Sequence, residues 1–158
     1  EKQASLAGSA SGDLVQLANL NGEEQGEASQ RVATAMKSLR QEARSNDKDR
    51  GVASRAFNQL WIQGVEAGQD QFRQGQYERA AAYFDLMADV APDQAWPLVM
   101  LAETKVHTGN KKAAIKALEQ AVQRGGLKRR QTLTEDPELK PLAAEPGFQK
   151  IVQGLSEQ

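Results

Sequence analysis

Apolar residues recur along most of this chain at spacings of three and four, the periodicity of a helix with one buried face. The plainest stripe consists of Val32, Ala35, Met36, Leu39 and Ala43. The pattern predicts helices over residues 27–44, 52–74, 77–91, 95–108, 111–124 and 147–155. A short helix is expected to begin at Asp13 and continue to Leu20, whereas residues 1–12 are small and polar and are expected to be frayed.

Glycine, proline and short polar residues mark where these helices begin and end. Gly75 and Gly109 each follow a predicted helix, at positions where glycine suits the turn between antiparallel helices. Asn110 is expected to cap the next helix, because its side-chain oxygen can accept from a free backbone N–H of the first turn. Asp136 followed by Pro137 predicts a further cap. The expected fold class is therefore all-α.

Two stretches of the chain repeat each other at an offset of 34 residues. The corresponding pairs are Gly68 with Ala102, Gly75 with Gly109, Ala80 with Ala114, Phe84 with Leu118, and Met87 with Ala121. A fixed period of about this length is typical of stacked helix–turn–helix units. Such units present a surface to a partner rather than a catalytic pocket, so the repeat predicts a binding function.

Composition narrows the possible chemistry. The 158 residues have a net charge of -1, so no strong overall field attracts nucleic acid or an anionic membrane. There is no cysteine and the only histidine is His107, which excludes disulfides, thiolate metal sites and histidine clusters. No apolar run reaches the roughly 18 residues that a membrane-spanning helix needs. We therefore expect no cofactor, no metal, no nucleic-acid partner, no membrane insertion and no catalysis.

The paired positions resemble the tetratricopeptide repeat (TPR) family, which favours small residues where two helices cross. The resemblance implies a TPR-like α-solenoid, a right-handed stack of antiparallel helix pairs with capping helices at both ends. It divides the chain into a flexible segment with a short helix, capping helices, two repeats and a C-terminal cap, over residues 1–26, 27–60, 61–94, 95–126 and 127–158. The tail is also similar to segments that close such arrays in bacterial proteins.

In this family the first helices of successive pairs line a concave groove, which the resemblance implies as the binding site. The residues expected to face it are Val65, Gln69, Phe72, Arg73, Trp96, Val99, Met100, Glu103, Val106 and His107. This mixture of apolar and polar groups suits a peptide, with Trp96 as the expected hot spot. In the alternative, Val65, Val99 and Val106 pack under the N-terminal helix, which then fills the groove.

The predicted function is protein or peptide binding through this groove, without chemistry. Two other interpretations stay open. The chain could be an accessory domain of a larger enzyme, or a self-assembly module whose groove holds a second copy or its own N-terminal segment. An extracytoplasmic location is favoured over a cytoplasmic one, because the chain begins at Glu1 rather than Met, lacks cysteine and starts with small residues.

Overall fold

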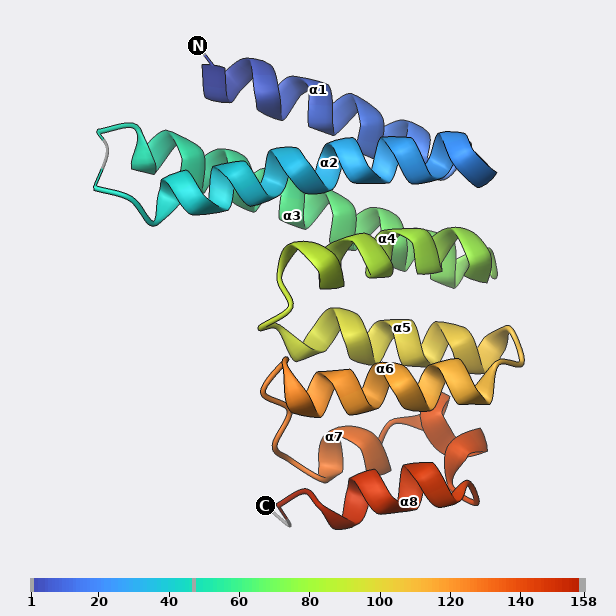
Figure 1. Cartoon of the computed structure of the whole chain (residues 1–158). Helices are drawn as coiled ribbons and strands as arrows, with labels where there is room; N and C mark the ends of the chain where they lie inside the picture. The colour runs from blue at the N-terminus through green and yellow to red at the C-terminus, as the bar shows by residue number, and fades with distance from the viewer. Residues whose placement is uncertain (1, 47, 157–158) are drawn as a thin grey trace. The chain divides into compact units, whose positions relative to one another are not determined.

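The computed structural model describes residues 2–46 and 48–156 (Figure 1). Every regular element in these ranges is a helix, and the nearest approach to a strand is an isolated bridge between Arg129 and Ser156. The predicted all-α class, with helices packed in successive antiparallel pairs, is therefore confirmed. The chain divides into two compact units, Glu1–Val90 and Ala91–Gln158, which are described separately. The right-handed sense of the stack stays a prediction.

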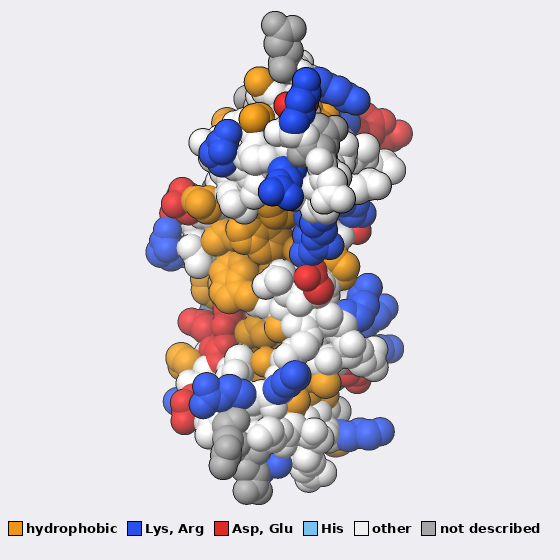
Figure 2. All heavy atoms as spheres, turned by 90° about the vertical axis from the view of Figure 1, so that its left-hand side faces the viewer, with side chains coloured by type: hydrophobic (Ala, Val, Ile, Leu, Met, Phe, Trp, Pro, Cys, Tyr) orange, Lys and Arg blue, Asp and Glu red, His pale blue; other side chains and the backbone are white. Residues whose placement is uncertain are grey.

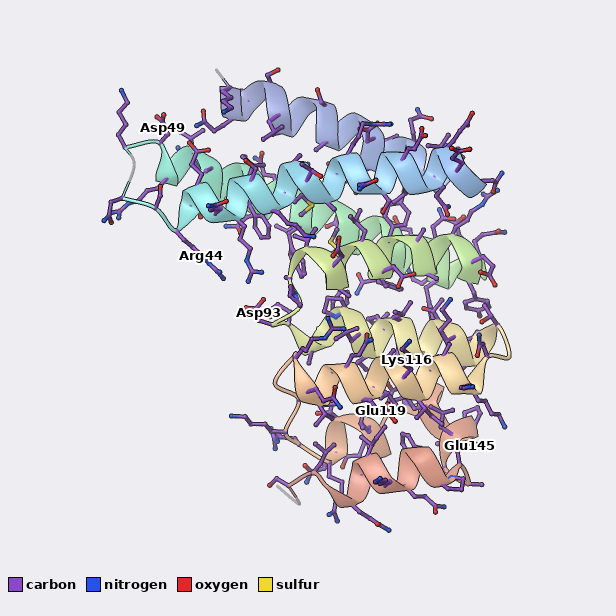
Figure 3. All side chains as sticks on the ribbon, viewed as in Figure 1. Arg44, Asp49, Asp93, Lys116, Glu119 and Glu145 are labelled. Atoms are coloured by element: carbon purple, nitrogen blue, oxygen red, sulfur yellow. The ribbon has the colours of Figure 1, made fainter. Side chains whose placement is uncertain are left out.

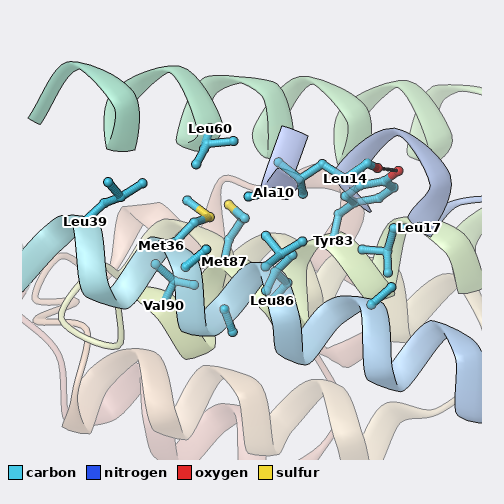
Figure 4. Packing of buried hydrophobic residues seen from close by; sticks show 14 of the residues in the cluster. Ala10, Leu14, Leu17, Met36, Leu39, Leu60, Tyr83, Leu86, Met87 and Val90 are labelled. Carbon is cyan, nitrogen blue, oxygen red and sulfur yellow. Dashed lines mark hydrogen bonds between the residues drawn. The ribbon is translucent and has the colours of Figure 1, made fainter. Parts of the chain in front are cut away.

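Unit 1 contains α1 (Lys2–Leu17), α2 (Gly22–Ala43), α3 (Arg50–Arg73) and α4 (Tyr77–Val90). α1 packs on α2 and α3, while α4 packs on α3 and α2. The apolar faces of these helices meet in one core (Figure 4). Its fully buried members include Leu14, Met36, Leu39, Tyr83 and Met87. Because α3 is one continuous helix, the boundary predicted between residues 60 and 61 falls inside it.

Two glycines of α3 let α4 approach closely. A Cβ atom at Gly64 would lie 2.7 Å from the methyl carbon of Met87, and one at Gly68 would lie 2.7 Å from a ring carbon of Phe84. Both distances are shorter than carbon atoms normally allow, so the helix pair needs glycine there unless the facing side chains move. The prediction that Gly68 permits close helix packing is confirmed.

The N-terminus differs from the predicted short helix at Asp13. α1 begins at Lys2, and it buries Ala10, Leu14 and Leu17 against the core. The serines and glycines before Asp13 lower the helix propensity of this stretch, but packing of one apolar face supplies most of the stability of a helix in a protein. Asp13 caps no helix; its carboxylate instead pairs with Arg31 at 3.0 Å.

α2 also begins earlier than predicted, because the stretch expected to be a loop after Asn21 is helical from Gly22 onward. Glu23 and Glu24 lie in its first turn, where negative charge is favourable to the helix dipole. Ala28, still within that early part, is completely buried. α1 and α2 therefore form a full helix pair, which packs on the pair α3 and α4.

Unit 2 contains α5 (Ala95–His107), α6 (Lys111–Gln123), α7 (Gln131–Thr134), the 3-10 helix η1 (Pro137–Leu142) and α8 (Pro146–Gln153). α5 pairs with α6, η1 packs on α5, and α8 packs on α6. The predicted caps are confirmed: Asn110 accepts from the backbone N–H of Ala113 at 3.0 Å, and Asp136 accepts from that of Glu138 at 2.9 Å. Gly109 has the expected positive φ of 78°.

The C-terminal tail closes unit 2 with backbone contacts. Arg130 donates from its guanidinium group to the carbonyl oxygens of Val152 and Leu155, at 3.1 and 3.2 Å. Phe148 on α8 is buried, as the predicted apolar stripe of the final helix requires. Leu155 is buried as well, although it lies beyond the end of α8. The tail departs from the helix-pair pattern and folds back on α5 and α6.

Candidate protein-binding surfaces

Large apolar side chains that reach solvent are the first guide to a binding surface. Among the described residues they are Val15, Val52, Ile62 and Trp96, with exposed fractions of 59%, 43%, 54% and 38%. The first three belong to α1 and α3 of unit 1, and Trp96 to α5 of unit 2. Figure 2 shows one face of the molecule, where hydrophobic side chains gather near the middle of the view with charged ones around them.

A groove of about 470 Å³ runs between α1 and α3. We call it the α1–α3 groove. It is lined by Ala4, Ala7, Gly8 and Ser11 of α1 and by Val52, Arg55, Ala56, Gln59, Leu60 and Gln63 of α3. The groove forms because α1 carries only small side chains along this face. A Cβ atom at Gly8 would meet nothing within 4 Å, so the space beside it is open.

Paired hydrogen bonds hold the two helices in register at one end of the groove. The Ser11 hydroxyl donates to the side-chain oxygen of Gln63 at 2.9 Å, and the Gln63 amide donates to the Ser11 carbonyl at 3.1 Å. The Gln63 side chain thus satisfies both the hydroxyl and the backbone carbonyl of Ser11, which lets these polar groups lie half-buried at low cost. The groove is thus a feature of packed helices and not of a loop.

An exposed stripe on α3 continues from this groove. Val52, Arg55, Gln59, Ile62 and Glu66 are all exposed and follow one another at spacings of three and four, so they share one helix face. No ion pair of Arg55 or Glu66 occurs in the described parts of the chain. Sequence reasoning missed this stripe because it followed the buried face of the helix. The signal was Ile62, an aliphatic residue outside the buried stripe.

The residues predicted to face the groove in unit 1 are only partly available. Val65, Gln69 and Phe72 are half-buried. The ring of Phe72 meets that of Tyr77 edge-on, with centroids 5.2 Å apart, where α3 turns into α4. Arg73 is exposed and forms an ion pair with Asp70, one turn earlier on the same helix. Phe72 therefore packs within this turn, and only the rest of its surface can contact a partner.

In unit 2 the predicted residues fall into exposed and covered sets. Trp96 is exposed, and Met100 and Val106 are half-buried. Val99 and Glu103 are buried, with exposed fractions of 8% and 9%, so neither presents a free surface for a ligand. His107 is exposed and contacts the carboxylate of Glu138 on η1.

The buried carboxyl group of Glu103 has an unusual environment. It is hydrogen-bonded to the side chain of Asp136, at the start of η1. Burial, that hydrogen bond and the charges of Asp136 and Glu138 raise the pKa of Glu103 to about 9. At neutral pH Glu103 is therefore a protonated acid that can donate to the Asp136 carboxylate. The sequence predicted that Glu103 faces the groove, but it gave no reason to expect that the C-terminal segment would bury this side chain.

The predicted residues thus belong to two units, and a single groove that unites them stays a prediction. The alternative, in which Val65, Val99 and Val106 pack under the N-terminal helix, also stays a prediction. α1 lies against α2 and α3 within unit 1, next to Gln63.

The remaining chemistry of the described chain is sparse. Residues 2–46 and 48–156 contain no group of three or more histidine or carboxylate side chains arranged to hold a metal ion. Within the same ranges, no helix combines the length and the hydrophobicity needed to cross a membrane. Charged residues such as Lys116 and Glu119 on α6 are exposed (Figure 3).

Comparison with known proteins gives a result that fits this geometry. A family model described as tetratricopeptide repeat matches residues 71–136, from the last turn of α3 to the residue before η1. Repeats of this family generally serve protein interaction and are typically non-catalytic. Neither the curated proteins nor the solved structures yielded a match. Residues 71–136 of this chain are therefore a tetratricopeptide-repeat domain.

Proposed function

We propose that this chain is a non-catalytic protein-binding module that holds a helix of a partner protein in the α1–α3 groove. The repeat domain supports the general role, since the family generally binds proteins. The observation that carries the proposal is the groove itself, an open hollow of about 470 Å³ between two firmly packed helices. Surface hollows of this kind, bordered by exposed apolar residues, mark interaction sites.

The lining favours a helix as the bound segment. Ala4, Gly8 and Ser11 are small and allow the backbone of a second helix to come close. Val52 offers apolar contact at the groove, and Ile62 extends it along α3. A matching partner carries apolar residues at i, i+3 or i+4, and i+7. An acidic residue of the partner near Arg55 would complete the contact.

The test fills the groove without disturbing the fold. Helical peptides that bind the full chain are selected from a display library, and their Kd values are measured by fluorescence anisotropy. Gly8→Leu places a bulky side chain in the groove, and we expect it to weaken binding at least tenfold. Gly26→Leu is the matched control, because Gly26 is also a helical glycine with nothing within 4 Å and lies outside the groove lining. Equal binding by both variants would contradict the proposal.

The sequence-predicted residues supply a second binding face to compare in the same assay. Trp96 is exposed on α5 and stays the proposed anchor for a partner of unit 2. A selected peptide whose binding is lost with Trp96→Ala but kept with Gly8→Leu would place the partner on α5. We expect the reverse pattern.

Self-association is a second candidate, favoured by the charges of the α3 stripe. If two copies of α3 lie antiparallel about an axis between Gln59 and Ile62, Arg55 of each copy faces Glu66 of the other. Such self-complementarity is what a two-fold interface needs. In this case Arg55→Glu should abolish a concentration-dependent increase in mass by light scattering, and Arg55→Glu combined with Glu66→Arg should restore it. A wild-type chain that stays monomeric at high concentration would exclude this candidate.

A further inference from the structure

The contact between α5 and η1 buries acidic groups against one another. Glu103 on α5 is 9% exposed and is hydrogen-bonded to Asp136, while Glu138 adds a further negative charge nearby. No ion pair of Glu103 with a Lys or Arg side chain occurs among the described residues. A buried carboxylate without a cation is costly, so the pair is stable only if a proton replaces the missing positive charge.

The buried face of α6 offers no compensating cation, and Lys105 of α5 and Lys140 of η1 form no ion pair with either acid among the described residues. The buried face of α6 consists of Ala114, Ala117, Leu118 and Ala121. The charged residues of α6, among them Lys112, Lys116 and Glu119, are exposed. On α5 itself, His107 lies one turn after Glu103 and contacts Glu138. The hydrogen bond between Glu103 and Asp136 requires a proton on one of the two acids, and that proton offsets part of the negative charge at this junction.

We propose that Glu103 and Asp136 form a proton-dependent clasp, which holds the C-terminal segment on α5 and loosens as the solution becomes alkaline. The clasp has two halves on separate elements, because Glu103 belongs to α5 and Asp136 is the residue that caps η1. Loss of the proton leaves two facing carboxylates, which repel and separate η1 from α5. Release of η1 would uncover the part of α5 that carries Glu103. This inference is independent of the α1–α3 groove.

The direction of the effect follows from linkage. The pKa of Glu103 in the folded chain, about 9, lies above the ordinary value of a glutamate, near 4.5. The folded state therefore binds a proton that the unfolded chain has already released. The stabilisation is complete below the ordinary glutamate pKa, falls as the pH rises, and is lost once the pH passes about 9.

The experiment measures the stability of unit 2 in the full chain as a function of pH. Trp61→Phe leaves Trp96 as the fluorescent reporter of unit 2, and urea unfolding is followed between pH 5 and pH 9.5. We expect the urea midpoint to fall steadily across this range. In the Trp61→Phe background, Glu103→Gln should flatten the curve above pH 7.5, because glutamine retains the hydrogen bond without a titrating proton.

Controls separate the clasp from other titrations. Glu119→Gln removes an exposed carboxylate of α6 and should leave the pH dependence unchanged. His107→Gln removes the side chain that contacts Glu138, and the fall above pH 7.5 should persist. Carbon-13 NMR of the Glu103 carboxyl group in the full chain reports the protonation directly, independent of any effect on folding. A Glu103 carboxyl that ionises near pH 4.5, or equal pH curves for wild type and Glu103→Gln, would overturn the proposal.

Discussion

The two units close their helix pairs in different ways. In unit 1, α2 and α3 are 22 and 24 residues long, and polar ties such as that of Ser11 with Gln63 lie at the edges of an aliphatic core. In unit 2, α5 and α6 have 13 residues each, and the folded-back tail supplies the remaining core. Long helices bury enough apolar surface to leave one face free, whereas short ones need a cover. Unit 1 can therefore present the α1–α3 groove, while η1 covers part of α5.

The largest expected effect comes from adding a methyl group at a glycine that closely contacts a neighbouring segment. Comparing one such glycine from each unit tests how rigid that contact is. A Cβ atom at Gly125 would lie 2.6 Å from the backbone Cα of Ala95, which has no way to move without shifting α5. We expect Gly125→Ala to destabilise unit 2 by about 3 kcal/mol. At Gly64 the obstacle is the flexible end of Met87, and alanine also favours the helix, so Gly64→Ala should cost about 1 kcal/mol or less.

Urea unfolding measures both variants, with Trp96→Phe leaving Trp61 as the reporter of unit 1 and Trp61→Phe leaving Trp96 as the reporter of unit 2. Equal losses would show that the backbone contact in unit 2 is no more rigid than the side-chain contact in unit 1.

A smaller effect is expected from the hydrogen bonds through which Tyr83 of α4 holds the C-terminal end of α1. The Tyr83 hydroxyl donates to the Leu14 carbonyl at 2.7 Å and accepts from the Ala18 backbone N–H at 3.2 Å (Figure 4). Tyr83→Phe leaves both backbone groups without this partner, so unit 1 should lose about 1–2 kcal/mol. Calorimetric or urea unfolding of unit 1 gives the value. An unchanged midpoint would mean that water replaces the hydroxyl group without cost.

The same substitution has a consequence at high pH. Burial raises the pKa of Tyr83, so the folded chain retains a proton that an unfolded tyrosine releases near pH 10. The stabilisation from this proton is lost as the pH rises above 10, and Tyr83→Phe should remove that loss. Unfolding curves at pH 9 and pH 11 test the difference.

The smallest expected effect concerns stability in acid, which should decrease in unit 1 as the pH falls but should not decrease in unit 2 through Glu103. The hydrogen bond from Arg31 lowers the pKa of Asp13, so this contribution is present above the ordinary aspartate pKa and is lost as the pH falls through the lowered value. Because the pair lies at the surface, water screens it, and Asp13→Asn should move the urea midpoint of unit 1 only slightly. Between pH 6 and pH 3 unit 1 should weaken in the wild type and less so in the variant. Unit 2 should show no such weakening from Glu103.

Much of the helical framework follows from local patterns. Gly75 and Gly109 end helices with positive φ values of 74° and 78°, as a glycine after an apolar stripe predicts. Asn110 and Asp136 cap where their sequence neighbours indicate. The repeat of small and bulky residues at a 34-residue offset also identified the family correctly. Caps and turns depend on neighbours close in sequence, and the repeat is a periodic pattern of residue types, so all of these features can be read from the sequence without the fold.

The N-terminal helix and the binding surfaces depend on distant neighbours. α1 contains several serines and glycines, and its helix is stabilised because Ala10, Leu14 and Leu17 pack on a core that the other three helices supply. For the same reason the small residues around Gly8 become one wall of a groove only when α3 lies beside them.

By itself the sequence determined the all-α class, most helix ends and the membership of residues 71–136 in the repeat family. Only the tertiary structure decided which helix faces stay open, because exposure depends on what packs alongside. It buried Glu103 against Asp136, thirty-odd positions along the chain, and it left Ile62 in solvent. A periodic pattern records which face of a helix is apolar, whereas burial, proton binding and access for a partner arise from contacts between segments far apart in the sequence.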